Sequence, residues 1–463
     1  MFEMLTDRIS TIVCGNLFDV DLHFYLAVLH QLSERTLDYV KLLCFEGDGV
    51  LNTVVKNKDS YNQQTIVELA YVLKHAVKVL LEIEPLHDQI ISSLIQEIRN
   101  SLIEWLCSST SSEFQVASLD LLSECVKSPT FISTLLLSEE REGSLLIMGL
   151  KRILALKQDK LILMGTMCLT KLVESISEPF QIKMILDSDL AELIFEFLHT
   201  SNVHQLCCVF QCLKAMAAHQ LFFEKCHAVY GLESTLSAIR VAMDTNRTTV
   251  LEQGLSFLTC LLSRQPENMP LFLNQSWLTC ANLLQASLKK EYQWMIHTAL
   301  CAVEAFLRDV HQQNLVDLKA ILLLVKTVIS ASQDHFQMLY QEREDDMSFE
   351  GLNCLIAIVH SINKTLLSSD VLCGNESSSL TALQQTLKSF CIGFLLPWTK
   401  TNIMESADKI VFEGNGTEII SELEKSSVET WFTAGPAVFS WAFLTPEKGL
   451  ALGKPMVCII ISL

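Results

Sequence analysis

Glycine and proline are scarce in this chain, with 16 glycines and 9 prolines among 463 residues. A protein of short strands and tight turns needs many such residues, so the scarcity argues against an all-β fold. Half of the residues are hydrophobic, and they recur at the three- and four-residue steps of amphipathic helices. The composition therefore predicts a chain that is almost entirely helical.

Basic residues are also in the minority. Lys and Arg number 34 against 53 Asp and Glu, which gives a net charge of -19 at pH 7. A surface of this sign repels a phosphate backbone instead of releasing its counterions. We therefore expect no direct binding of nucleic acid, and we expect proteins as partners.

Long apolar runs are absent too. The apolar end 456–463 is far shorter than the roughly 20 residues that a helical membrane span requires, and residues 1–21 contain several charges and do not form a signal peptide. We expect an intracellular protein without membrane contact. The 16 cysteines are then most simply reduced core residues, because disulfides are characteristic of small secreted domains.

Catalytic motifs are missing from the sequence. It contains no Gly-x-Ser-x-Gly elbow, no phosphate-binding Gly-x-x-x-x-Gly-Lys-Ser/Thr loop, no Gly-x-Gly-x-x-Gly fingerprint and no His-Glu-x-x-His. Acidic pairs such as Asp345/Asp346 are typical of a solvated surface. The sequence predicts a protein that is not an enzyme and has no cofactor.

A repeated pair, Leu-x-x-apolar, is the clearest positive signal. Successive first leucines of the pairs lie 50, 50, 44, 42, 45 and 52 residues apart, close to the roughly 40 to 47 residues of HEAT and armadillo repeats. The pairs are Leu69/Val72, Leu119/Leu122, Leu169/Leu172, Leu213/Met216, Leu255/Leu258, Leu300/Val303 and Leu352/Leu355. Because one amphipathic helix cannot bury its stripe alone, we expect a continuous stack with the first leucines at equivalent buried places.

The unit at His204–Ala242 shows the pattern best. Its apolar residues predict a helix at 203–219, a further apolar run, a turn at Tyr230-Gly231, and a helix at 232–243. The region before the repeats predicts one helix from Asp21 to Phe45 and a loop from Glu46 to Tyr61. The predicted division is an N-terminal segment at 1–61, helical repeats at 62–396 and a tail at 397–463.

The tail has a different texture from the rest of the chain. Residues 431–463 contain Pro436, Pro446 and Pro455 and several large apolar groups without helical period. Such a segment can neither extend a helical stack nor cap it with a polar face. We expect an irregular, mobile tail, and a chain that is an unusually ended or short form of a longer protein.

One cluster of cysteine and histidine deserves a metal hypothesis. His204, Cys208 and Cys212 follow at i, i+4 and i+8, so a helix places them on one face where they can offer three ligands. Structural zinc sites normally bring two short-spaced ligand pairs, which are absent here. The competing interpretation, small apolar cysteines in a helix core, is the stronger one, and no metal is predicted.

A partner-binding surface is the remaining possibility for function. Solenoids bind other proteins along a groove, often through a few aromatic anchors. The candidates are Trp105, Trp277, Tyr292 and Trp294. The competing interpretation is that these rings pack between neighbouring repeats.

The region from about 62 to 396 resembles the armadillo/HEAT superfamily, most clearly in HQLFFEKCHAVYGLESTLSAI. The resemblance implies an all-α, right-handed superhelical solenoid. The ladder of Trp and Asn found in nuclear-import armadillo proteins is missing, so cargo binding of that kind is not implied.

Two stretches, HQLCCVFQCLKAMAAH and LEQGLSFLTCLLSRQPENMPLFL, are also similar to a family of large helical-repeat proteins needed for meiotic double-strand break formation and chromosome synapsis. That similarity implies a meiotic scaffold and a nuclear location. The alternatives are a cytoplasmic adaptor in transport or cytoskeletal assembly, and a metal-dependent module at the Cys/His cluster.

Overall fold

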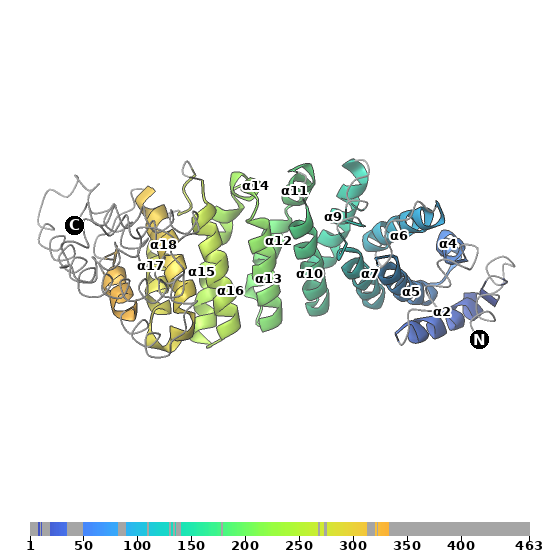
Figure 1. The fold of residues 1–463 in the computed structure, drawn as a ribbon, viewed down its shortest axis with the longest axis horizontal. Helices are drawn as coiled ribbons and strands as arrows, with labels where there is room; N and C mark the ends of the chain where they lie inside the picture. The colour runs from blue at the N-terminus through green and yellow to red at the C-terminus, as the bar shows by residue number, and fades with distance from the viewer. Residues whose placement is uncertain are drawn as a thin grey trace, which may run out of the picture. The chain divides into compact units, whose positions relative to one another are not determined.

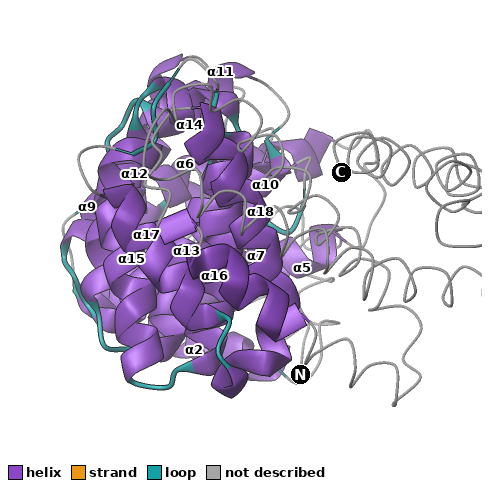
Figure 2. Cartoon of the chain, turned by 90° about the vertical axis from the view of Figure 1, so that its left-hand side faces the viewer, coloured by secondary structure: helices purple, strands orange, loops and turns teal. Residues whose placement is uncertain are grey.

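The structure is a computed structural model of the chain, and it contains only helices and loops, without a strand, in the residues that it describes (Figure 2). Those residues are 8–9, 11, 19–34, 50–81, 89–108, 111–128, 131–132, 135, 140–176, 179–266, 269–272, 276–312, 320–321 and 323–332. The chain divides into two compact units, residues 1–234 and 235–463, with the boundary inside one helix. Each unit is described by itself.

The first unit is built from two layers of helices (Figure 1). In the first layer each helix packs against the next along the chain: α2 (Asp19–Ser33), α5 (Gln63–Leu81), α7 (Ser112–Cys125), α10 (Asp159–Ser175) and α13 (Val203–Met216). The second layer contains α4 (Val50–Lys56), α6 (Gln89–Cys107), α9 (Glu140–Ala155), α11 (Pro179–Leu186), α12 (Leu190–Glu196) and α14 (Gln220–Glu224).

The two layers pack against each other through helices that are consecutive along the chain. The helix α6 contacts α7, α9 contacts α10, and α12 contacts α13. Within the second layer α6 contacts α9, and α9 contacts both α11 and α12. Each repeat therefore consists of second-layer helices followed by one first-layer helix, which is the arrangement of an all-α solenoid.

The second unit continues with the same kind of helix. The helix α15 (His227–Asp244) crosses the boundary and is followed by α16 (Thr248–Arg264), α17 (Ser276–Ser287) and α18 (Ile296–Gln312). The helices α16 and α17 both pack against α18. Short 3-10 turns lie at Lys58–Ser60 and Phe197–His199 in the first unit and at Lys290–Met295 in the second.

The predicted repeat register is confirmed wherever the structure describes it. All twelve members of the six pairs from Leu69/Val72 to Leu300/Val303 have an exposed fraction of 0%. They lie on α5, α7, α10, α13, α16 and α18. The residues that recur in the sequence are therefore the buried stripe of one helix in each repeat, as leucine spacing on an amphipathic helix requires.

Polar contacts link neighbouring repeats at about the same sequence separation. The Lys74 ammonium on α5 lies 2.5 Å from the Asp120 carboxylate on α7. On α13 the Gln205 side chain donates to the Asp159 carbonyl oxygen on α10, at 2.9 Å. These pairs are each 46 residues apart, so they fix the same register that the leucines set.

The predicted turn at Tyr230-Gly231 is wrong. The chain turns at Cys226, whose φ of 63° is in the left-handed region, and α15 then runs from His227 through Gly231. Gly231 serves a different purpose, because a Cβ at this position would lie 2.0 Å from the Phe195 ring of α12. The glycine allows α15 to approach that ring closely and does not end a helix.

Two predictions near the N-terminus are also wrong. Residues 46–61 were expected to be a loop, yet α4 forms there because Leu51, Val54 and Val55 bury one face of a short helix. The helix expected to reach Phe45 ends at Ser33, and Glu34 is already a turn. The hydroxyl of Ser33 donates to the Leu29 carbonyl oxygen at 2.6 Å, which occupies an acceptor at that end.

Several predictions fall outside the described residues. They are the pair Leu352/Leu355 and the whole tail at 397–463. The boundaries at 61 and 396, and the continuity of one stack from 62 to 396, stay predictions.

Candidate protein-binding groove

The helix α13 places the three candidate metal ligands in three different environments. His204 is exposed, Cys208 is half-buried and Cys212 is fully buried. Burial raises the pKa of the Cys212 thiol to about 12, and burial also raises that of Cys208. A cysteine binds zinc as its thiolate, so the burial of Cys212, which favours the neutral thiol, opposes metal binding. Across the described residues, no group of three or more His, Cys, Asp or Glu side chains is arranged to hold a metal ion.

The described aromatic candidates differ in how far they are exposed. Trp105 on α6 is only 3% exposed, and its ring packs edge-on against Phe114 at 5.9 Å between centroids. Tyr292 is also buried, and its hydroxyl donates to the Met243 carbonyl oxygen at 3.3 Å. Trp277 on α17 is half-buried, and the side chain of Trp294 lies outside the described residues. Trp105 and Tyr292 therefore cannot offer their rings to a partner in this structure.

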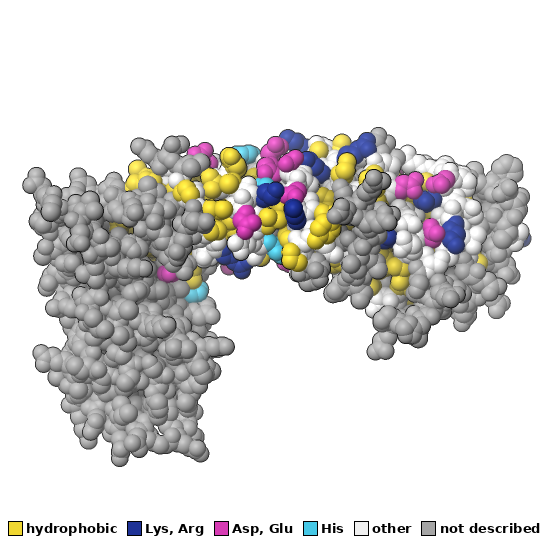
Figure 3. Space-filling view, turned by 90° about the horizontal axis from the view of Figure 1, so that it is seen from above, with side chains coloured by type: hydrophobic (Ala, Val, Ile, Leu, Met, Phe, Trp, Pro, Cys, Tyr) yellow, Lys and Arg dark blue, Asp and Glu magenta, His cyan; other side chains and the backbone are white. Residues whose placement is uncertain are grey.

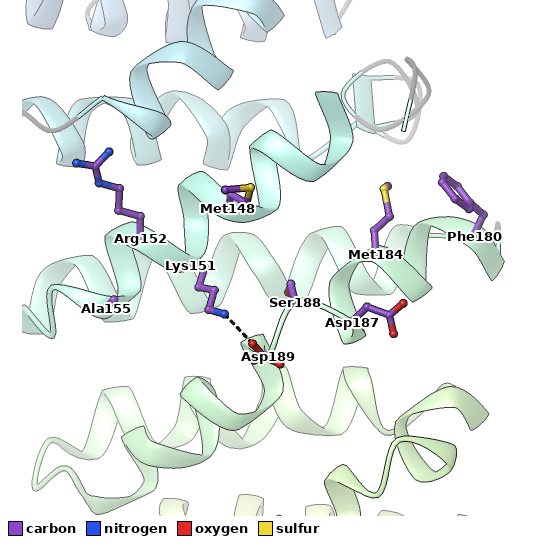
Figure 4. Close-up of a pocket in the computed structure, with 9 residues that line it drawn as sticks. All are labelled: Met148, Lys151, Arg152, Ala155, Phe180, Met184, Asp187, Ser188 and Asp189. Atoms are coloured by element: carbon purple, nitrogen blue, oxygen red, sulfur yellow. Dashed lines mark hydrogen bonds and ion pairs between the residues drawn. The ribbon is translucent and has the colours of Figure 1, made fainter. Parts of the chain in front are cut away.

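A groove that the sequence did not reveal lies in the second layer of the first unit, between α9 and α11. It is an open hollow of about 750 Å³, lined by Met148, Lys151, Arg152, Ala155, Phe180, Met184, Asp187, Ser188 and Asp189 (Figure 4). In the space-filling view from above, apolar side chains alternate with basic and acidic ones on the described surface (Figure 3). Such a mixed, open hollow is suited to another macromolecule.

The apolar wall of this groove is exposed to an unusual degree. Met148 on α9 is 58% exposed and Phe180 on α11 is 47% exposed, while Met184 is half-buried. The opposite faces of both helices hold them in place, because Leu146, Leu150 and Leu154 of α9 and Ile185 and Leu186 of α11 are buried. The exposed methionine and phenylalanine are therefore additional to the core, since each helix already has a full buried stripe.

Two ion pairs lie at the rim of the groove. The Lys151 ammonium lies 3.0 Å from the Asp189 carboxylate, which closes one side (Figure 4). The Asp187 carboxylate lies 2.6 Å from the ammonium of Lys225, just after α14. Asp189 has a φ of 56°, so the turn between α11 and α12 directs this carboxylate toward α9.

The polar groups that line the groove interact with other parts of the fold. The Ser188 hydroxyl donates to the Ile185 carbonyl oxygen at 2.6 Å, so it is used to end α11. The two aspartates are in ion pairs, and no histidine lines the hollow. The serine and both aspartates of the lining thus have partners within the fold.

A second, more polar hollow of about 340 Å³ lies in the second unit. Its lining includes Arg240, Asn282, Lys289 and the buried Tyr292. Asn282 and Lys289 are exposed, whereas Tyr292 is buried. Its lining exposes less apolar surface than that of the groove between α9 and α11, so it is the weaker candidate for protein binding.

Comparisons with known proteins bear on the family. A family model described as the N-terminal domain of Meiosis inhibitor protein 1 matches residues 5–390. Meiosis inhibitor protein 1 of Mus musculus is 28% identical over 246 residues, which cover 50% of this chain and 19% of that protein. The protein of the same name from Homo sapiens is 29% identical over 214 residues, covering 44% of this chain and 17% of the relative. The matched part is thus under a fifth of either relative.

Solved structures with similar helix arrangements include engineered repeat proteins. A designed armadillo repeat protein is 13% identical with a TM-score of 0.43, covering 56% of this chain and 100% of its own. Another engineered protein is 14% identical with a TM-score of 0.44, covering 56% of this chain and 97% of its own. None of the described helices combines the length and apolarity that a membrane crossing requires.

Proposed function

We propose a function from the premise that this chain belongs to the family of the Meiosis inhibitor protein 1 N-terminal domain. The chain acts as a non-catalytic helical-repeat scaffold that binds proteins during meiosis. Its role lies in double-strand break formation and chromosome synapsis, as its sequence resemblance implies. The single observation that carries the proposal is the match of the family over residues 5–390.

The physical character of the chain supports a scaffold. The repeats bury their leucines in a continuous core within each unit and leave helix faces open to partners. The groove between α9 and α11 offers exposed apolar side chains bounded by charges, which is the composition of a protein-binding surface. Its serine and aspartates are engaged within the fold and are not arranged for catalysis.

The net charge of -19 supports action through proteins. An acidic solenoid near chromosomes is repelled by DNA, so its location in a meiotic nucleus must depend on protein contacts. A nuclear position in meiotic prophase is therefore part of the proposal, and the partner is a protein.

The test is a null allele combined with an epitope tag at the same gene. The tagged protein is expected in nuclei of germ cells entering meiotic prophase. Null cells are expected to form fewer meiotic double-strand breaks and to leave chromosomes unsynapsed in spread nuclei. Normal break numbers and full synapsis in the null would overturn the meiotic role, and broad somatic expression in the cytoplasm would favour a transport or cytoskeletal adaptor.

A further inference from the structure

The outward face of α9 carries a stripe of side chains that the described fold leaves exposed. Leu145, Met148 and Arg152 follow at steps of three and four residues, so they lie on one side of α9, and Leu156 comes directly after the helix ends. All four are exposed. The helical part of the stripe, from Leu145 to Ala155, is about 15 Å long, since a helix rises about 1.5 Å per residue. It is matched in length to about three turns of another helix.

Phe180 and Met184 of α11 form the opposite wall of the same hollow (Figure 4). They lie at i and i+4, so both project from one side of α11 toward the groove. Two helical ridges with a gap between them form the groove that a third helix fills when its apolar side chains interdigitate. An extended strand is a poorer fit, because the described residues offer no sheet edge for it to join.

The charged side chains of this groove differ in whether they already have an ion-pair partner. Lys151 is paired with Asp189, and Asp187 with Lys225. Arg152 instead donates to the Cys107 carbonyl oxygen of α6, and within the described ranges no carboxylate forms an ion pair with its guanidinium. Arg152 stands in the middle of the apolar stripe, between Met148 and Leu156, so a carboxylate beside the partner's apolar residues would complement it.

We propose that the groove between α9 and α11 binds an amphipathic helix of a partner protein. The helix has apolar residues at i, i+3 or i+4, and i+7, with an acidic residue next to them that faces Arg152. This inference rests on the proposed scaffold function and names the partner chemistry of its groove. A second copy of this chain is disfavoured as the occupant, because two molecules that each carry -19 repel one another.

The experiment uses the full chain and a fluorescent, stapled synthetic peptide of about four helical turns. The peptide has leucines at i, i+4 and i+7 and one glutamate beside them. Fluorescence polarisation gives its Kd. A scrambled peptide of equal composition lacks the stripe, and this control is expected to bind at least about tenfold more weakly.

Two protein variants form a matched pair. Met148→Glu places a charge in the groove and is expected to weaken binding at least about tenfold, because the new carboxylate must lose water against the peptide's leucines and, four residues before Arg152, competes with the peptide's glutamate for that guanidinium. Met167→Glu changes the same residue type at a similar exposure, 53% against 58%, but on α10. It is expected to change Kd by less than about twofold, since it lies outside the groove. Unchanged circular dichroism melting of both variants shows that they fold.

A charge swap tests the role of Arg152. Arg152→Glu is expected to raise the Kd of the glutamate peptide about two- to fivefold, which is the size of effect that the loss of an exposed ion pair has. A peptide with lysine in place of the glutamate should bind this variant with the original affinity. Equal weakening by Met148→Glu and Met167→Glu, or equal binding of the scrambled peptide, overturns the inference. Self-association of the chain that Met148→Glu abolishes also overturns it, in favour of a second copy. None of these results depends on meiosis, so they separate failure of the groove from failure of the proposed function.

Discussion

Gly231 offers the sharpest test of how the repeats are packed. In an exposed helix, replacing glycine with alanine stabilises the fold by roughly 0.5 to 1 kcal/mol, because glycine loses more backbone freedom on folding. Gly231 is inside α15, and its φ is not in the left-handed region. Backbone conformation alone therefore predicts that Gly231→Ala stabilises the protein.

Packing predicts the opposite sign. The added Cβ would lie 2.0, 2.2 and 2.4 Å from three atoms of the Phe195 ring, whereas carbon atoms in contact stay about 3.5 to 4.0 Å apart. Phe195 is itself buried and its ring lies 6.2 Å from that of Phe222, so it cannot move without disturbing the core. Overpacking of this kind costs about 1 to 3 kcal/mol. Subtracting the helix-propensity gain leaves a net loss of about 0 to 2.5 kcal/mol, and because the overlap with the ring is severe we expect about 1 to 2 kcal/mol.

Hydrogen–deuterium exchange is the suitable assay, because a long repeat chain need not unfold as one unit. Amides of α12 and α15 are expected to exchange about five- to thirtyfold faster in Gly231→Ala, as 1 to 2 kcal/mol requires. Phe195→Leu provides the second arm of a double-mutant cycle, in which Gly231→Ala becomes neutral or stabilising because space has been made. Slower exchange in the single variant, or an equal loss in both backgrounds, would refute the packing argument.

Other predictions concern the core thiols, leucines and histidines. Leu213→Ala should cost about 2 to 5 kcal/mol in urea unfolding, because its side chain is fully buried; a loss under about 1 kcal/mol would show that the repeat register is wrong. Burial raises the pKa of Cys212 to about 12, so iodoacetamide at pH 8 should label the exposed Cys226 and leave Cys212 unlabelled until the protein unfolds. Equal labelling of Cys212 and Cys226 in the folded protein, measured by mass spectrometry, would contradict this. Burial, aided by Lys78, lowers the pKa of His75 from 6.5 to about 4. Because the unfolded chain then binds the proton more readily than the folded chain, the free energy of unfolding should fall as the pH drops from 6.5 toward 4. This fall should be smaller in His75→Gln. An unchanged pH dependence in His75→Gln would remove His75 as its cause.

The leucine register was predictable from the sequence because the spacing of apolar residues along a helix indicates which of its faces is buried. Leu119 and Leu169 each lie in a three- and four-residue pattern that only a helix can place on one side. Helix ends follow local chemistry in the same way. The Asn202 side chain accepts from the backbone N–H of His204 at 3.0 Å, and α13 begins there.

The purpose of Gly231 was not predictable, because it depends on a ring 36 residues earlier in the chain. A glycine after an apolar run reads equally well as the end of a helix or as a point of close approach. The groove was hidden for the same reason. Met148 and Phe180 belong to different helices, and nothing in the local sequence distinguishes either of them from the many other apolar residues of the chain. Only the packing of α9 against α11 brings the two exposed side chains together.

The most direct test of the central claim is chromosome synapsis in cells whose own gene carries Met148→Glu or Met167→Glu. The measurement is the fraction of spread meiotic nuclei with all chromosomes synapsed, at matched protein levels on immunoblots. A scaffold that works through the groove between α9 and α11 predicts full synapsis with Met167→Glu and a synapsis defect approaching that of the null with Met148→Glu. Full synapsis in the Met148→Glu cells, alongside a defective null, would contradict the account.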